Sequence, residues 1–468
     1  MASTFFGLTI AYSGLQAANT SLTITGHNVS NINTKGYTKQ QAGTQAADAL
    51  RTHTTYGAIG SGVVVTEISQ IRDSYYDVKY RNNMANYGQY SVKESYMGQI
   101  EDYLDEFTLN GYSQEYKNFF SAVNQLTITP GDTSAKNQLI NNAKSLADYF
   151  NTLTTNLRNV QADANNEIKD AVQQINSYAK NIAALNRQIN QIEANYGNAN
   201  DLRDKRNAMI DELSEIVNLE TSEEDMGNNV SNFSVRINGQ TLVSSYSYNT
   251  LETVARTDKK NYSDAEGLYD VQWNSGQKFD MYSTSLSGHL KGLIDIRDGN
   301  NGEHENIETD DDGNNVTDSD GNLVLTTAPA ADKTVSYKGV PYYQAQLNEF
   351  AKIFSDAVNK IMKSGYTSDG SSKGISLFVT QPNTTVMSAG NITVNPELLK
   401  NADLLAIKKE QNDGESDAKI MEELNKLQSE KIFAGGTGSY FLESIVSDMS
   451  IDSQKAVNLY KNYTDLKT

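Results

Sequence analysis

At 468 residues, the chain is long enough for about three domains of ordinary size. Its formal net charge of −19 at pH 7 excludes nucleic acid and insertion into an anionic membrane as expected partners, because both would repel such a surface. The chain has no cysteine, which excludes disulfides and thiol chemistry, and no apolar run approaches the roughly 20 residues that span a bilayer.

The N-terminal segment carries the most informative pattern of the chain. Its apolar and small side chains recur in steps of three and four, which predicts a helix whose stripe packs on another helix. Burying the large stripe residues contributes roughly 7–15 kcal/mol, whereas ordering about 25 backbone units costs on the order of 25–50 kcal/mol. We therefore expect the helix to stay loose until a partner covers this stripe: Leu8, Ala11, Leu15, Ala18, Leu22, Thr25, Val29 and Ile32.

A turn rich in asparagine follows the stripe. Asn31 and Asn33 suit Asx-turns and helix ends, and Gly36, which precedes Tyr37, permits a left-handed backbone. From the residues alone, an ordinary helix end that runs into a loop explains this turn as well as a functional role does.

Residues 7–40 as a whole resemble the N-terminal motif of the axial proteins of the bacterial flagellum, the rod, hook and hook-associated families. This chain has His27 where the family usually has Asn, and Ser30 where it has Ala. The resemblance implies that the N-terminal helix polymerises into an inner tube. It also implies that the stripe and the turn make subunit contacts: Leu8, Ala11, Leu15, Ala18, Leu22, Val29, Asn31, Asn33, Gly36 and Tyr37.

Helical periodicity dominates the chain from residue 73 to residue 217. Residues 41–72 lack this period and end in a Gly-Ser-Gly turn that leads into a predicted strand from Val63. Four helices are then predicted from the apolar spacing, over residues 73–107, 113–126, 139–196 and 201–217.

The helix over residues 139–196 is the strongest structural signal. Its apolar residues alternate in steps of four and three, with one stutter. Asp132 or Thr133 is expected to cap its start, and Gly197 marks its end. At about 1.5 Å per residue the helix is a rod of about 87 Å, so the molecule should be elongated.

After residue 220, apolar and polar residues alternate, as is typical of β-strands, and the helical periodicity disappears. One hairpin is predicted over residues 233–243 around a type I′ Asn238-Gly239 turn, and a second over residues 268–282. A short helix over residues 286–298, capped by Ser285, and an acidic loop over residues 300–322 follow. Helical period resumes in the remaining chain, with an extended stretch between helices: helices over residues 342–361, 415–432 and 440–466, and the extended stretch over 378–394.

Several internal segments resemble the hook-associated protein 1 family. They are residues 201–215, 286–298, 347–366 and 392–397, with Met362 where the family usually has His. The family usually ends with a further amphipathic helix that pairs with the N-terminal one, and this chain stops at Thr468 without it. The expectation is either a truncated chain or an inner tube that is built differently.

These patterns predict a mainly α fold, an elongated helical bundle or coiled-coil domain with an inserted small β-rich domain and a polymerisation-dependent N-terminal helix. The expected domains are residues 1–45, the N-terminal axial helix and turn; 46–219, the first part of the long-helix domain; 220–340, the β-rich outer domain; and 341–468, the second part of the long-helix domain.

No pattern typical of catalysis is present. The chain lacks a phosphate-binding Gly-x-x-x-x-Gly-Lys loop, a His-Glu-x-x-His pair and a Gly-x-Ser-x-Gly elbow. Its histidines, His27, His53, His289 and His304, are scattered. Residues 308–319 resemble a calcium loop but have Ser319 where the loop needs a bidentate Glu. We expect no enzyme activity, cofactor or metal.

The resemblance implies a structural subunit that joins the flagellar hook to the filament by self-assembly into a junction ring. Its implied partners are further copies of itself, the hook protein, the second hook–filament junction protein and a flagellar export chaperone. The chain begins without a basic, apolar leader, so secretion to the extracellular flagellum by type III export, without a cleaved signal peptide, is expected. Alternatives are another flagellar axial protein, such as the hook protein or the second junction protein, and an unrelated coiled-coil secreted protein or adhesin.

Overall fold

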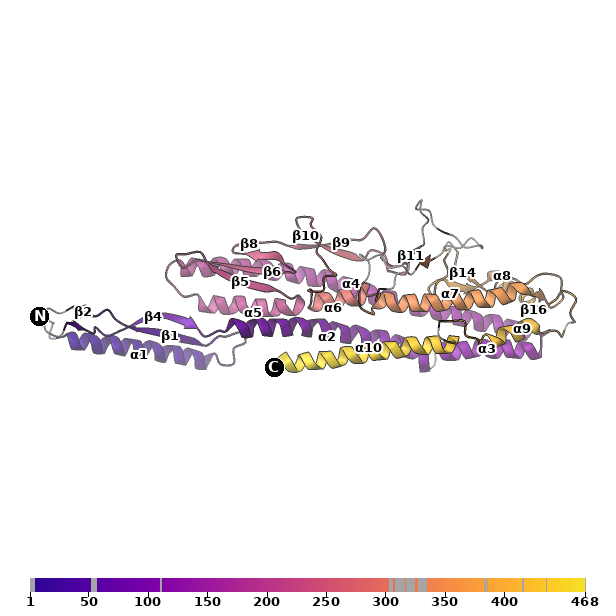
Figure 1. Ribbon diagram of the computed structural model, residues 1–468, viewed down its shortest axis with the longest axis horizontal. Helices are drawn as coiled ribbons and strands as arrows, with labels where there is room; N and C mark the ends of the chain where they lie inside the picture. Colours follow the sequence, from indigo (N-terminus) through magenta and orange to yellow (C-terminus); the bar gives the residue numbers. More distant parts are fainter. Residues whose placement is uncertain are drawn as a thin grey trace.

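The computed structural model describes residues 5–51, 57–109, 112–302, 306–307, 316, 325–326, 335–382, 384, 386–414, 416–434 and 436–467. The molecule is elongated and mainly helical (Figure 1). A thin N-terminal unit, residues 5–70, projects from one end of a long helical bundle. The last helix, α10 (Gly438–Lys467), ends beside the middle of the molecule (Figure 1).

The N-terminal unit consists of one helix on a two-stranded ribbon. Helix α1 (Phe6–Ser30) lies along the antiparallel strands β1 (Gln40–Ala46) and β4 (Val63–Gln70). The predicted strand after the Gly-Ser-Gly turn is therefore confirmed, and the ribbon covers one face of α1. The short strands β2 (Leu50–Arg51) and β3 (Ala58–Ile59) form a separate hairpin beyond it.

The bundle is built around α4 (Thr133–Glu193), a helix of 61 residues. The carboxylate of Asp132 caps it by accepting a hydrogen bond of 2.9 Å from the Ser134 N–H, as expected for one of the two predicted caps. The apolar stripe of α4 is largely buried from Leu139 to Ile189, whereas Ile192, in the last turn, is 41% exposed. The helices around it are α2 (Ser74–Leu109), α3 (Tyr112–Ile128), α5 (Asn200–Ile216), α6 (His289–Asp298) and α7 (Val340–Ser364).

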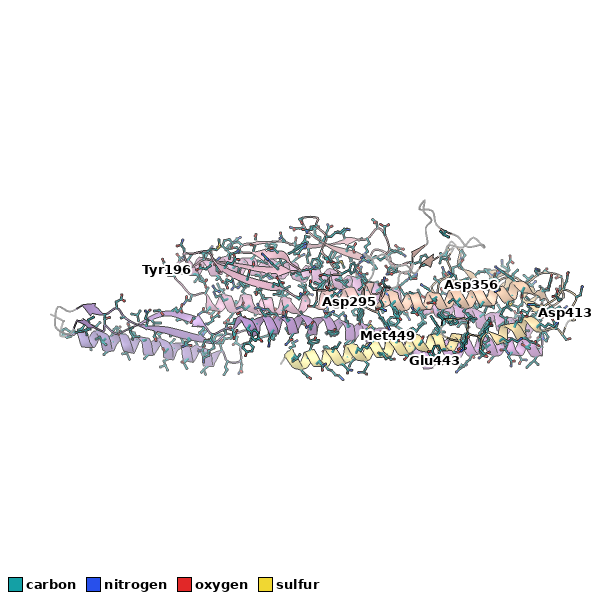
Figure 2. All side chains as sticks on the ribbon, viewed as in Figure 1. Tyr196, Asp295, Asp356, Asp413, Glu443 and Met449 are labelled. Carbon is teal, nitrogen blue, oxygen red and sulfur yellow. The ribbon has the colours of Figure 1, made fainter. Side chains whose placement is uncertain are left out.

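Helix α10 packs along α2 and closes one side of the bundle (Figure 1). Figure 2 places Met449 in this helix, where its side chain is fully buried. Nearer the end of α10, the contact consists of tyrosine pairs. The rings of Tyr90 and Tyr463 stack with centroids 5.5 Å apart, and those of Tyr87 and Tyr460 lie 5.6 Å apart.

The β-rich region contains a four-stranded antiparallel sheet in the order β5 (Glu220–Asp225), β6 (Ser231–Ile237), β7 (Gln240–Ser244) and β8 (Ser247–Tyr248). Asn238 and Gly239 join β6 to β7 with φ of 50° and 75°, which confirms the type I′ turn. The buried side chains of β6 and β7 belong to the same continuous core as the bundle.

The second predicted hairpin forms only in part. Residues 277–279 pair with β10 (Tyr269–Trp273) through one bridge, from Lys278 to Gln272, and two backbone hydrogen bonds, whereas the full ladder of β10 is with the preceding strand β9 (Leu251–Ala255). The alternation in 278–282 is real, because Phe279 and Met281 are buried. Burial of alternate residues, however, does not require a ladder of hydrogen bonds.

Two of the shorter helices are shorter than predicted. Helix α6 begins at His289 and not at residue 286, because its N-cap Gly288 adopts φ of 105° close to the backbone of Ile216. Helix α9 (Lys419–Lys426) is shorter than residues 415–432. The remaining short elements are β11 (Asn306–Ile307), β12 (Leu325–Thr326), β13 (Tyr366–Thr367), β14 (Phe378–Thr380), β15 (Ile392–Val394), α8 (Pro396–Lys400), a 3-10 turn (Ala402–Leu404) and β16 (Ala406–Lys408).

Candidate assembly surface

The large residues of the predicted stripe on α1 all lie exposed. Leu8, Leu15 and Val29 are each 66% exposed, and Leu22 is 70% exposed. The small stripe residues Ala11 and Ala18 are exposed as well. The buried residues of α1 are Ala17 and Ile24, which lie on the opposite side of the helix from the stripe. The ribbon thus covers the less apolar face of α1 and leaves the leucines in solvent.

The N-terminal end of the stripe forms an apolar groove of about 520 Å³. Two exposed aromatic side chains, Phe5 and Tyr12, extend the stripe there. The complete lining is Phe5, Leu8, Thr9, Ala11, Tyr12 and Leu15. An exposed apolar surface of this kind is typical of a protein–protein contact.

Helix α1 carries no Asp, Glu, Lys or Arg in its 25 residues, although the whole chain has a net charge of −19. Its threonine hydroxyls donate back to the helix carbonyls, for example from Thr20 to Gln16 O at 3.0 Å and from Thr25 to Ser21 O at 2.8 Å. These bonds satisfy the hydroxyls within the helix. Copies of α1 can therefore approach one another without charge repulsion.

The turn after α1 is closed by hydrogen bonds. The Asn31 side chain donates to His27 O at 3.0 Å, and the Tyr37 hydroxyl donates to Asn28 Oδ1 at 2.7 Å. Asn33 is exposed. Gly36 adopts φ of 81° and approaches α5 so closely that a Cβ there would lie 3.1 Å from that of Ala208. The structure therefore brings Gly36 of the predicted turn to α5, leaves Asn33 exposed and keeps the stripe residues away from the bundle.

Asp204 of α5 holds the two chain segments that connect the N-terminal unit to the bundle. One carboxylate oxygen accepts from the Thr38 N–H at 3.1 Å, and the other accepts from Gln70 Nε2 at 2.8 Å. The side chain of Asn200 donates to Ile68 O at 2.7 Å. We call this set of contacts, together with the ion pair between Lys35 and Glu212 at 3.5 Å, the joint.

Sequence reasoning did not identify the residues of the joint. Asp204 lies within residues 201–215, which were recognised only as a family-like segment. Gln70 lies at the end of a predicted strand, where it carried no signal. Asn28 is adjacent to the predicted turn, and its side chain forms two bonds with the backbone of Gln40. The one available clue was the high density of Asn and Asp in both segments.

A cleft of about 1000 Å³ lies beside the joint. Residues of β4, including Thr66 and Glu67, form one wall, and Asp225 and Val230 of the β5–β6 turn line it from the bundle side. Tyr196, at the end of the bundle nearest to the N-terminal unit, also lines it and is 90% exposed (Figure 2).

Acidic and basic side chains both line the cleft, and its two arginines from α5 are already paired. The hydrogen-bonded carboxylate of Glu193 raises the pKa of Arg203, which also pairs with Glu223 at 3.0 Å. Burial lowers the pKa of Arg206 to about 10, and its guanidinium packs 3.8 Å from the centre of the Phe233 ring. The cleft therefore presents no surplus of one charge to a small ligand.

Nothing in the described part of the chain resembles a metal centre, since no group of three or more His, Asp or Glu side chains there could hold an ion. His27 lies 2.9 Å from the Tyr37 hydroxyl, and His289 lies 3.7 Å from Glu167. His53, His304 and nearly all of the calcium-like segment fall outside the described residues, as does most of the acidic loop. No described helix is long and apolar enough to cross a membrane.

Comparison with known proteins gives one consistent result. A family model described as the flagellar hook-associated protein FlgK helical domain matches residues 97–378, more than half of the chain. The chain is 27% identical to flagellar hook-associated protein 1 of Bacillus subtilis over 390 residues, 80% of this chain and 70% of that protein. It is 33% identical to the protein of the same name in Salmonella typhimurium over 219 residues, 46% of this chain and 39% of that protein.

A solved structure is also similar. The flagellar hook junction protein FlgK from Burkholderia pseudomallei is 22% identical, with a TM-score of 0.49 over 65% of this chain and 46% of that chain.

Proposed function

Because this chain belongs to the flagellar hook-associated protein FlgK family, we propose that it is a structural subunit that joins the flagellar hook to the filament by assembling with copies of itself into a ring. The observation that carries the proposal is the exposed stripe of α1. An apolar stripe with helix-packing periodicity, left uncovered in the single chain, needs another helix to bury it.

The absence of charged residues from α1 supports self-association in particular. Two copies of a chain with a net charge of −19 repel each other. Helix α1 has no acidic side chain, so a contact between two α1 helices brings no like charges together. The ribbon stabilises α1 from the other side, so the stripe is presented on a formed helix.

The further partners follow from the same role. A ring between hook and filament would contact the hook protein on one side and the second hook–filament junction protein on the other, and an export chaperone would cover the stripe before secretion. The location proposed for the assembled subunit is the extracellular flagellum, reached through type III export without a cleaved signal peptide.

A double variant, Leu15→Ser with Leu22→Ser, tests the stripe. Each leucine contributes about 1.5–3 kcal/mol when buried, so the variant should lose co-sedimentation with purified hooks and fail to restore motility to cells that lack the subunit. Leu399→Ser is the matched control, because Leu399 is 46% exposed on the bundle, far from α1. If the double variant co-sediments as well as the control, the stripe is not the assembly surface.

A further inference from the structure

We propose that Asp204 is a positioning residue that fixes the orientation of the N-terminal unit, and with it the direction in which the stripe faces. When the hydrogen bonds of the Asp204 carboxylate are lost, the N-terminal unit rotates into the cleft beside the joint. The inference concerns the single chain in solution. The inference rests on the proposed function in one respect only, the role of the rotation. In a ring, this rotation would let a subunit contact neighbouring subunits at different angles.

The first observation that supports the proposal is that the N-terminal unit shares no apolar core with the bundle. The continuous core of the molecule begins at Val92, and none of its described members belongs to the N-terminal unit. Ala17 and Ile24 are buried on the ribbon instead. Units that share no core are expected to move relative to one another.

The covalent connection to the bundle is held by one polar residue, Arg72, whose guanidinium pairs with Asp77 at 2.6 Å and with Asp211 of α5 at 3.5 Å. Strand β4 leads into α2, whose first two turns are largely exposed. Tyr75 is 59% exposed, Tyr76 is 67% exposed and Val78 is 54% exposed. Because this connection has little apolar packing, polar contacts set the orientation of the N-terminal unit, namely the joint and the ion pairs of Arg72.

Asp204 is the centre of the joint because it binds both connecting segments at once. The residue is only 7% exposed, and its carboxylate accepts from the Thr38 N–H, which follows α1, and from the side chain of Gln70, which ends β4. Hydrogen bonds to a charged group are the stronger ones. Lys35 and Glu212, the other charged pair of the joint, are largely exposed, so their pairing contributes little.

The cleft supplies the space for the movement. Its wall on the N-terminal unit is β4, and its bundle wall includes Tyr196 and the β5–β6 turn. Closing it would bring apolar Tyr196 and Met226, which is 67% exposed, toward the ribbon.

The chain has no cysteine, so a pair of introduced cysteines can carry spin labels without background. Glu67→Cys, on the β4 wall of the cleft, and Met226→Cys, next to the lining residue Asp225, place labels on the two sides of the cleft, both at exposed positions. Pulsed electron paramagnetic resonance on the full-length labelled monomer should give one narrow distance distribution. Adding Asp204→Asn should broaden it and shift it to shorter distances, and Gln70→Met should do the same.

Asp201→Asn is the matched control, because Asp201 lies on the same helix and accepts only a long bond of 3.4 Å from Gln40. The control should keep the narrow distribution. If Asp204→Asn lowers the unfolding midpoint but leaves the distribution unchanged, Asp204 is merely structural and the proposal fails. It also fails if the parent distribution is already broad. Neither result depends on ring assembly, which the stripe variants test separately.

Discussion

The side chain of Asn28 pairs with the backbone of Gln40 as a neighbouring strand would. Its Nδ2 donates to Gln40 O at 2.9 Å, and its Oδ1 accepts from the Gln40 N–H at 2.9 Å. The same Oδ1 accepts from the Tyr37 hydroxyl. One residue near the end of α1 thus fixes the point at which β1 begins.

Asn28→Ala should destabilise the N-terminal unit by about 3 kcal/mol, since it removes three hydrogen bonds worth about 1 kcal/mol each. Amide hydrogen exchange in the monomer should then show faster exchange along α1 and β1 and unchanged exchange in α4. Asn33→Ala, at an exposed position of the same turn, is the control and should change neither. Equal effects of the two variants would contradict the role assigned to Asn28.

The two faces of α1 should respond oppositely to the same substitution. Ile24→Ser, at a position that is 7% exposed, should cost about 3 kcal/mol of local stability. Leu22→Ser, at 70% exposure, should stay within about 0.5 kcal/mol in the monomer. Limited proteolysis of the N-terminal unit measures both. A strong loss with Leu22→Ser would mean that the stripe is already covered in the single chain.

Gly88→Ala should strongly destabilise the bundle. A Cβ at Gly88 would lie 2.1 Å from the Glu215 carbonyl oxygen, so α2 and α5 would have to separate. The expected cost is about 1–3 kcal/mol or more in denaturant unfolding. Gly98→Ala in the same helix meets nothing within 4 Å and should be neutral or stabilising by up to about 1 kcal/mol.

Asp298 should make the bundle sensitive to acid. Burial alone would raise its pKa, but the guanidinium groups of Arg297 and Arg256, at 2.6 and 2.8 Å, hold that pKa well below the ordinary value. A carboxyl group whose pKa is lower in the folded than in the unfolded chain stabilises the fold fully above about pH 4, the pKa of Asp in the unfolded chain. This stabilisation is lost progressively as the pH falls below that value.

Asp298→Asn should therefore cost about 3–5 kcal/mol at pH 7, because it leaves buried arginines without their partner. The difference between parent and variant in the free energy of unfolding should shrink as the pH falls from 4 toward 2. Asp270→Asn is the control, since Asp270 pairs with the same Arg256 but is 52% exposed. A pH-independent difference would show that the charge of Asp298 is not what matters.

Local patterns predicted the helices well and the pairing of distant segments poorly. The stripe and cap of α4 depend on neighbours within a few turns, so periodicity locates the helix. Strand β10 is flanked by two segments, residues 251–255 and 278–282, and either could have formed its ladder of hydrogen bonds. The alternation of apolar and polar residues does not distinguish between them.

The candidate site divides in the same way. The stripe from Leu8 to Val29 is a local pattern and was predicted from the sequence, whereas its exposure depends on which face the ribbon takes. The joint unites Thr38 with Asp204, 166 positions apart. These two residues come together only because the 61-residue helix α4 and its neighbours pack side by side. The spacing of residues along the sequence does not predict such a contact.

The uncharged surface of α1 also determines how a ring would respond to salt. Raising ionic strength from 0.1 M to 1 M shortens the Debye length from about 10 Å to about 3 Å, which weakens exposed ion pairs. Dissolved ions find no such pairs to screen along α1, but they do screen the repulsion between acidic bodies of neighbouring subunits. A ring held together by this helix would therefore be more stable at high ionic strength and less stable at low ionic strength.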